Sequence, residues 1–341
     1  MTSNALVFMT DFLRDVYKVT RFKPQKKRLV TSSSLKVPVK FTLIKRDSEL
    51  TYSKLSDIRS HHRRGSFAID KVAMSGRAKS IQEIFHCCPK SVLIEGIPGI
   101  GKSVLSKEIA YYWASGEILE GILVSLDNDL HSTSSVSELF YYLNTKYDVV
   151  NDSDVEITAR RLKESKGSTI VLVIDGYNEC PIDSQLRLFV DKIIHGERLP
   201  KCMIVVLSRP SIASVSIDYI VDQRYEILGL TSTEQSQYIS EALKEVPEKR
   251  AELEKCLTQY PIISVLTYSP FYLSILLCIV KLKNLPKTLT EIAELLIVYT
   301  VCQEYANQGK SPFSEMHKLV NLPKSAKAFV YHLAHLAFKG L

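Results

Sequence analysis

The chain has few cysteines for its length, and none of them forms a metal-binding or disulfide pattern. Seven cysteines occur among 341 residues, and apart from the neighbours Cys87 and Cys88 each stands alone, without a CxxC pair. An odd number at irregular spacing argues against a disulfide framework and against a zinc site. The cysteine content therefore favours reduced thiols in a cytoplasmic protein.

We expect neither a secretory leader nor a membrane span. The N-terminal apolar stretch meets Asp11 too early for the hydrophobic region of a leader. Residues 262–280 carry no charge over 19 positions, which is long enough to cross a bilayer. Pro270 interrupts this run, and tyrosine and serine side chains surround it. We therefore predict two buried helices that are separated at Ser269-Pro270.

The basic residues are concentrated in the first quarter of the chain. Residues 1–90 hold 19 Lys/Arg against 7 Asp/Glu, a net charge of +12, whereas the remainder holds 25 against 30, a net charge of −5. Such asymmetry can mark an acidic partner such as nucleic acid or an anionic membrane. The basic residues form short clusters, at 26–28 and 61–64, without interleaved aromatic residues. This pattern favours a solvated lead-in over a nucleic-acid surface.

From residue 89 onward, short apolar runs alternate with helix-length segments of mixed polarity. The runs consist largely of Val, Ile and Leu and lie at 91–94, 122–126, 170–174, 203–207 and 225–228. Continuous apolar runs of this length are typical of strands that are buried on both faces of a parallel sheet. Their alternation with helices predicts a three-layer α/β fold. We find no internal repeat in the sequence.

After Gly229 the strand pattern stops and a helical pattern takes over. Thr231–Glu234 forms a capping box, and Thr288 or Thr290 begins a later helix. A last amphipathic helix places Phe329, Leu333 and Leu336 on one face. Before the core, a helix is predicted near 5–20 and an extended stretch near 37–44. The predicted parts are a basic N-terminal segment, an α/β core, an all-α subdomain and the start of a further domain, at residues 1–88, 89–230, 231–320 and 321–341.

An eight-residue motif, GIPGIGKS, matches the phosphate-binding pattern GxxxxGK[ST]. It follows a predicted strand and opens a helix, so backbone N–H groups and the helix dipole face the same point. We expect Lys102 to neutralise the β- and γ-phosphates of a nucleotide and Ser103 to bind Mg²⁺. The residues predicted to bind the nucleotide here are Gly96, Ile97, Pro98, Gly99, Ile100, Gly101, Lys102, Ser103 and Val104.

Two further strands end in residues that suit phosphoryl chemistry. Asp175 ends an apolar run 73 positions after Lys102, and we expect it to hold Mg²⁺ together with Ser103. Glu179, four residues on, is a candidate to orient or activate the attacking water. Arg209 follows the next apolar run and is a candidate sensor of the γ-phosphate. Asp175, Glu179 and Arg209 are thus the predicted catalytic residues.

These motifs together resemble the NACHT family of STAND NTPases, the nucleotide-switch module of NOD-like receptors. The resemblance covers about residues 70 to 341 and rests on GIPGIGKS, YYWASGEIL, VLVIDGYNEC, VVLSRP, YEILGLT and SPFYL. The final AFVYHLAHLAFKGL is similar to the start of the family's winged-helix domain. The resemblance implies a three-layer P-loop NTPase core with a parallel sheet, then a helical subdomain and a winged helix. It also implies that Pro270, within SPFYL, contacts the adenine base.

The chain departs from the family pattern at several positions. Asn178 stands where the family usually has Asp, and Asn cannot accept the proton of an attacking water. Asn128 lies near a position where many members carry Arg. The chain ends before the winged-helix histidine that contacts the ADP β-phosphate in relatives. Neither a death-fold effector domain nor C-terminal repeats are recognisable in these 341 residues.

The leading hypothesis is a molecular switch that is closed with ADP and that opens and self-associates with ATP. The resemblance implies partners in innate immune or cell-death signalling and ATP hydrolysis that is slow at most. One alternative is a conventional P-loop ATPase that acts with nucleic acid through the basic segment; the absence of helicase-like motifs after Asp175 counts against it. A second alternative, motivated by Asn178, is a nucleotide-binding scaffold without hydrolysis.

Overall fold

The computed structural model describes seven stretches of the chain, at residues 3–20, 43–45, 78–118, 122–126, 170–181, 184–210 and 220–282, and shorter pieces between 135 and 164 and between 285 and 331. It forms two compact units. The first comprises Met1–Arg21 and Lys40–Thr231, and the second Phe22–Val39 and Ser232–Leu341. The second unit's helices therefore begin directly after the last strand of the α/β part.

Some predictions fall outside the described residues. These are the basic clusters at 26–28 and 61–64, the position of Asn128, and the three apolar side chains Phe329, Leu333 and Leu336 of the last predicted helix.

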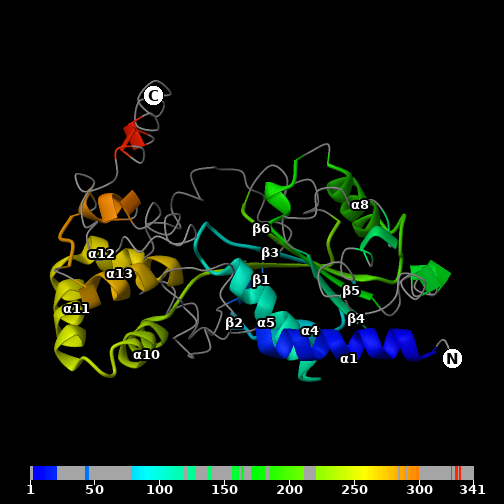
Figure 1. The fold of residues 1–341 in the computed structure, drawn as a ribbon, viewed down its shortest axis with the longest axis horizontal. Helices are drawn as coiled ribbons and strands as arrows, with labels where there is room; N and C mark the ends of the chain where they lie inside the picture. Colours follow the sequence, from blue (N-terminus) through cyan, green and yellow to red (C-terminus); the bar gives the residue numbers. More distant parts are fainter. Residues whose placement is uncertain are drawn as a thin grey trace. The chain divides into compact units, whose positions relative to one another are not determined.

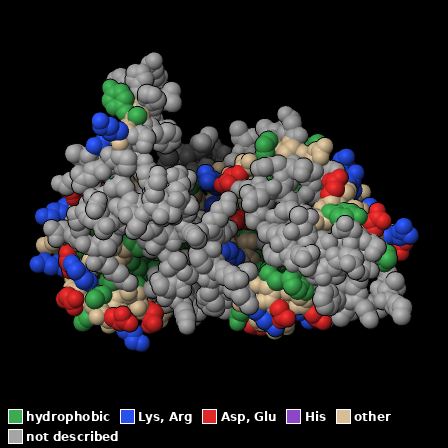
Figure 2. Space-filling model, in the orientation of Figure 1, with side chains coloured by type: hydrophobic (Ala, Val, Ile, Leu, Met, Phe, Trp, Pro, Cys, Tyr) green, Lys and Arg blue, Asp and Glu red, His purple; other side chains and the backbone are tan. Residues whose placement is uncertain are grey.

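On the face drawn in Figure 2, the described Lys/Arg and Asp/Glu side chains are interspersed and do not gather by sign. The described part of that face therefore presents no sustained basic stripe.

The first unit is built on one mixed sheet. Its strands are β1 (Leu43–Lys45), β2 (Ala78–Lys79), β3 (Ser91–Glu95), β4 (Ile122–Leu126), β5 (Ile170–Asp175), β6 (Met203–Ser208) and β7 (Gln223–Ile227). They lie in the order β2-β1-β7-β3-β6-β5-β4. The five strands from β3 onward are parallel, and β1 and β2 add an antiparallel edge. Each of the five apolar runs singled out in the sequence forms one parallel strand, which confirms the predicted α/β fold.

Helices cover both faces of this sheet. They are α1 (Ser3–Thr20), α4 (Ile81–His86), α5 (Lys102–Ala114) and α8 (Gln185–Ile194), with a short 3-10 turn η2 (Tyr177–Glu179) after β5. Figure 1 shows α1 and α5 on one side of the strands and α8 on the other. Local capping defines two of the starts: the Glu83 N–H donates to Ser80 Oγ at 3.2 Å, and the Arg187 N–H donates to Ser184 Oγ at 3.2 Å. The layers are thus helix, sheet and helix, as predicted.

The N-terminal helix α1 packs on α5, the helix that follows the GIPGIGKS motif. Leu13 and Tyr17 are buried, with 0% and 5% of their surface exposed. The Tyr17 hydroxyl donates to the Leu123 carbonyl of β4 at 3.4 Å, and its ring meets Trp113 of α5 edge-on at 5.9 Å. The Arg14 guanidinium lies over the same Trp113 ring at 5.5 Å. The helix predicted near 5–20 is confirmed, and it belongs to the folded unit instead of to a solvated lead-in.

The second unit is helical over its described residues. It contains α10 (Ser232–Ala242), α11 (Pro247–Gln259), α12 (Pro261–Leu266) and α13 (Pro270–Leu282). Each of the last three begins with proline, which suits a helix start because proline has no N–H to leave unpaired there. The apolar run is divided between α12 and α13 at Ser269-Pro270, as predicted. None of the described helices has the length and hydropathy to cross a membrane.

Polar contacts inside the second unit explain how its helices join. Thr267, between α12 and α13, is fully buried and donates through its hydroxyl to Gln235 Oε1 of α10 at 2.8 Å. Further on, the Glu291 N–H donates to Thr288 Oγ1 at 3.2 Å, while the Lys287 N–H donates to the Glu291 carboxylate at 2.6 Å. Of the two threonines considered from the sequence, Thr288 is therefore the one that caps the later helix.

The packing of α1 leads to a stability prediction. Leu13→Ala removes a fully buried side chain, so we expect the free energy of unfolding to fall by about 2 to 5 kcal/mol. Asp15→Ala, on the exposed side of the same helix, serves as the control and should change it by no more than about 0.5 kcal/mol. Urea unfolding followed by Trp113 fluorescence measures both. Equal stability of the two variants would contradict a docked α1.

Candidate nucleotide-binding site

The phosphate-binding motif forms a tight loop between β3 and α5. A Cβ atom on Gly96 would lie 2.6 Å from the Ile100 side chain, so only glycine fits at the start of this loop. Gly101 has φ of 110°, a left-handed conformation that favours glycine, and α5 begins at the next residue, Lys102. The first backbone N–H groups of a helix have no partner within the helix and attract anions. The strand-loop-helix context predicted for the motif is therefore present.

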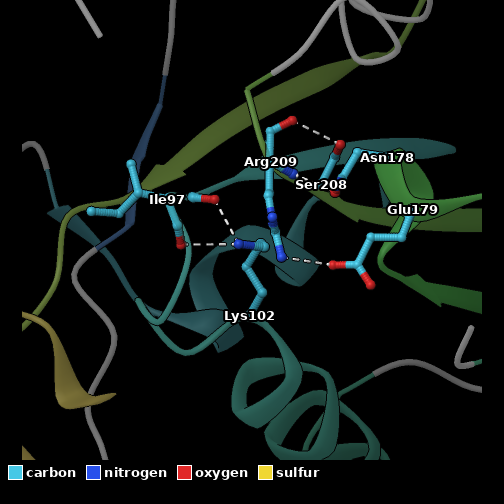
Figure 3. A network of polar contacts seen from close by, with 7 residues as sticks. Ile97, Lys102, Asn178, Glu179, Ser208 and Arg209 are labelled. Atoms are coloured by element: carbon cyan, nitrogen blue, oxygen red, sulfur yellow. Dashed lines mark hydrogen bonds and ion pairs between the residues drawn. The ribbon is translucent and has the colours of Figure 1, made fainter. Parts of the chain in front are cut away.

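The Lys102 side chain turns back over this loop. Its ammonium donates to the carbonyls of Gly96 at 2.6 Å and Ile97 at 3.0 Å (Figure 3). Burial, followed by the nearby Arg209 charge, lowers the pKa of Lys102 to about 8, while Asp175 and Glu179 act in the opposite direction. The structure thus brings a partly desolvated cation and the predicted acidic residues to one place.

The predicted catalytic residues come from the ends of two neighbouring strands. Asp175 is the last residue of β5, and Glu179 ends the η2 turn that follows it. Arg209 comes directly after β6, which pairs with β5 in parallel. An Arg209 Nη2 donates to the Glu179 carboxylate at 3.0 Å, and both side chains are nearly half exposed. In Figure 3 the guanidinium lies between the Lys102 ammonium and Glu179.

Asn178 also contacts Arg209, but its side chain meets the backbone of Arg209 and not the guanidinium. The Arg209 N–H donates to Asn178 Oδ1 at 2.8 Å. This contact requires only an acceptor oxygen, which either Asn or Asp supplies. From the sequence we expect Asn178 to lie beside an attacking water. The structure shows that its side-chain oxygen accepts a hydrogen bond from the N–H of Arg209, directly after β6.

Tyr177, which the sequence analysis did not single out, anchors the η2 turn. Its side chain is fully buried, its hydroxyl donates to the Asp191 carboxylate of α8, and the Arg187 guanidinium lies over its ring at 5.1 Å. Burial and the Asp191 hydrogen bond raise the pKa of Tyr177 far above its ordinary value, so it remains a neutral donor. An aromatic residue inside an otherwise polar string was the available signal. The turn that carries Asn178 and Glu179 is therefore tied to α8.

A buried ion pair lies next to the loop and was also missed. Glu95, the last residue of β3, accepts hydrogen bonds from Arg224 of β7 at Nε (2.9 Å) and Nη2 (2.5 Å). The two side chains are 0% and 8% exposed. The signal was an acid that ends an otherwise apolar strand immediately before Gly96. This pair joins the residue before the loop to the neighbouring strand, so it defines where the loop begins.

The remaining predicted residues are placed as follows. Ser103 lies in the first turn of α5, and Val104 beside it is 42% exposed. Pro270 is the first residue of α13 in the second unit, and its contact with a base stays a prediction. The residues of the first unit fit a nucleotide phosphate with Mg²⁺: a glycine loop at a helix start and a lysine amine for the anion, and the oxygens of Ser103 and Asp175 for the ion.

A parallel α/β sheet with this loop, an acid at the end of β5 and an arginine at the end of β6 defines a P-loop NTPase. Residues 90–246 match the NACHT domain family. This match confirms the resemblance to the NACHT family that was found in the sequence.

The relatives place this domain in longer proteins. The chain is 24% identical to mouse Protein NLRC3 over 284 residues, which cover 74% of the chain and 26% of the relative. It is 26% identical to mouse Protein NLRC5 over 146 residues, which cover 38% of the chain and 8% of the relative. Among solved structures, a Thermotoga maritima RuvB mutant is 14% identical with a TM-score of 0.33, covering 74% of this chain and 77% of that one. The chain thus spans about a quarter or less of the length of these receptor relatives.

The buried ion pair makes a testable contribution to stability. Arg224→Met leaves the Glu95 carboxylate buried without its main partner, so we expect the free energy of unfolding to fall by about 3 to 5 kcal/mol. The double variant Glu95→Met with Arg224→Met should recover most of this loss, because neither charge is then buried. Lys249→Met, in the more exposed Lys249–Glu252 pair, is the control and should cost at most about 1 kcal/mol. Additive losses in urea unfolding of the double variant would contradict this account.

The lowered pKa of Lys102 predicts how nucleotide affinity depends on pH. Phosphate oxygens favour the charged ammonium, so binding should raise the pKa of Lys102 above its value of about 8. Bound protein then holds more protons than free protein above pH 8. Affinity for ADP should therefore be nearly constant below pH 7 and fall above pH 8, by up to about tenfold per pH unit.

Calorimetric titration with ADP at several pH values, in buffers of different ionisation enthalpy, measures both the affinity and the proton uptake. Lys102→Arg is the control, because a guanidinium stays charged throughout this range and should flatten the pH dependence. Absence of proton uptake at pH 8.5 in the native protein would show that Lys102 is not the titrating group.

Proposed function

We propose that the chain is an ADP/ATP-dependent molecular switch whose NACHT domain is closed with ADP and opens to self-associate with ATP. The observation that carries the proposal is the convergence of Lys102, Arg209 and Glu179 over one loop. Two cations and an acid from three different elements meet where a terminal phosphate would lie. Such a site can distinguish a triphosphate from a diphosphate by charge.

Each residue would have a separate task in binding. The N–H groups at the start of α5 would hold phosphate oxygens, and Lys102 would exchange the Gly96 and Ile97 carbonyls for the β- and γ-phosphates. Ser103 and Asp175 would hold Mg²⁺, which would neutralise phosphate charge. Arg209 would contact the γ-phosphate, and Glu179 would orient an attacking water. The enzyme activity we expect is slow ATP hydrolysis at most.

Contacts that only a triphosphate makes supply the free energy of a switch. A ligand shifts a two-state equilibrium only through its different affinity for the two states. Moving the ratio of states a hundredfold in favour of the open one needs about 2.7 kcal/mol of such difference, which one or two charge-assisted hydrogen bonds provide. Arg209 follows β6, which lies between β3 and β5 in the sheet, and this position supports such a role.

The biological setting follows from the relatives and is proposed on that basis. Similarity to the mouse proteins NLRC3 and NLRC5 supports a role in innate immune or cell-death signalling, in the cytoplasm, with self-association and protein partners. The match covers 26% of the first of these proteins and 8% of the second. An acidic partner such as nucleic acid has less support from the described residues, since the basic side chains on the face drawn in Figure 2 are interspersed with acidic ones.

Nucleotide binding without hydrolysis is the second candidate. It is favoured by Asn178, whose oxygen is engaged by the Arg209 N–H and which cannot take up a proton from water. In this case the chain would exchange nucleotides without resetting itself. Turnover that is measurable in the native chain and unchanged in Asn178→Asp would exclude this candidate.

The first experiment is to identify the nucleotide carried by the purified protein. Denaturation followed by ion-exchange chromatography should release about one ADP per chain, because a closed switch retains its product. Lys102→Ala should bind ADP at least tenfold more weakly, because the phosphates lose their main cation. Lys90→Ala, an exposed lysine at the other end of β3, removes the same charge and should leave the ADP in place. If native protein neither carries nor binds ATP or ADP, the switch is excluded.

A further inference from the structure

The turn after β5 contacts Arg209 at two points, and these contacts suggest how the site responds to the γ-phosphate. Asn178 Oδ1 accepts from the Arg209 N–H at 2.8 Å, and the Glu179 carboxylate accepts from Arg209 Nη2 at 3.0 Å. The first contact holds the backbone of Arg209, while the second occupies the guanidinium. An incoming phosphate would therefore compete for the guanidinium contact and leave the backbone contact in place.

The two contacts also differ in how easily they break. The Arg209 and Glu179 side chains are 47% and 43% exposed, and an ion pair at this exposure is worth little and is readily exchanged. The backbone contact is supported from behind. Tyr177 is buried against Asp191 and Arg187 of α8, and the Gly176 N–H donates to the Leu207 carbonyl at 3.1 Å. The backbone contact is thus supported by the fold, whereas the exposed guanidinium can change partner more readily.

We propose that Glu179 and the γ-phosphate compete for the Arg209 guanidinium, and that Asn178 is the positioning residue that keeps Arg209 within reach of both. The proposal rests on the switch function above and specifies its regulation. With no γ-phosphate present, Arg209 stays paired with Glu179, which holds the carboxylate away from a water. When the γ-phosphate takes the guanidinium, Glu179 is released at the moment when there is a bond to hydrolyse.

Electrostatics near Lys102 support such an exchange. Arg209 is the charge that, after burial, lowers the pKa of Lys102, so two cations share a small volume with Asp175 and Glu179 as counter-charges. An incoming γ-phosphate adds negative charge at this point, which relieves the repulsion between the two cations. It also repels the Glu179 carboxylate. Both effects favour transfer of the guanidinium from Glu179 to the phosphate.

A double-mutant cycle tests the competition. The quantity measured is the ratio of the ADP dissociation constant to that of the nonhydrolysable triphosphate AMP-PNP, both with Mg²⁺, by calorimetry. Glu179→Gln removes the competitor, so we expect this ratio to rise about three- to fivefold, the range that an exposed ion pair allows. In the background of Arg209→Met the same change should have almost no effect. Glu197→Gln, the same substitution at an exposed position of the first unit, is the control and should leave the ratio unchanged.

The role of Asn178 is tested on the same coupling. Asn178→Ala removes the acceptor for the Arg209 N–H. In this background, Glu179→Gln should change the ratio of dissociation constants equally with Arg209 and with Arg209→Met. Asn178→Asp keeps an acceptor oxygen and should restore the dependence on Arg209. A residue that only stabilised the fold would alter both dissociation constants without altering this coupling.

The outcomes separate the two proposals. An equal rise of the ratio with and without Arg209 would mean simple relief of charge repulsion, and it would overturn the competition. No rise at all would overturn it as well, and in both cases the switch function would stand. If the native protein binds neither ADP nor AMP-PNP, the proposed function and the competition are both excluded.

Discussion

The register of three parallel strands is the constraint on which the site depends. β6 lies between β3 and β5, and the pairing sets Glu95 opposite Ser208 and Asp175 opposite Leu207. The ladder continues one residue beyond each strand, because the N–H groups of Gly96 and Gly176 donate to the carbonyls of Ser208 and Leu207, each at 3.1 Å. These two bonds hold the phosphate loop and the η2 turn on either side of Arg209. A slip of one residue in β6 would turn every side chain of the strand to the opposite face and separate the three groups.

The acidic residues of the site explain why its two cations, Lys102 and Arg209, can lie so near each other. Lys102 and Arg209 are both basic, and their proximity, together with burial, lowers the pKa of Lys102. Asp175 and Glu179 offset this effect. The charges of these four side chains therefore nearly balance, and a nucleotide with its magnesium ion would add charges of both signs. Glu95 and Arg224 form a second, buried pair on the other side of β3, where water cannot screen it. That pair acts on the position of the loop, whereas the exposed pair of Arg209 and Glu179 is available to change partner.

Local sequence patterns were sufficient for the main elements of the described α/β core. Continuous runs of Val, Ile and Leu identified the five parallel strands, and a glycine-rich motif between strand and helix identified the phosphate loop. Contacts between distant positions were not accessible in this way. Glu95 and Arg224 are 129 residues apart, and nothing in either strand identifies the other as its partner. The docking of α1 on Trp113 depends likewise on packing that only the folded chain determines.

Asn178 shows how the structure changes the meaning of a sequence difference. In the sequence alone, DGYNE has Asn178 where the family usually has Asp, and the missing proton acceptor suggests impaired hydrolysis. In the folded chain the oxygen at this position accepts from the Arg209 N–H, a task for which Asn and Asp are equivalent. The remaining carboxylate of the turn, Glu179, is itself occupied by the Arg209 guanidinium. Under the proposed competition, activation of a water would therefore depend on what holds Arg209 as well as on the residue at position 178. Under the same competition, Arg209 would have to leave Glu179 before the carboxylate could act, and hydrolysis would then depend on the same phosphate that is to be removed.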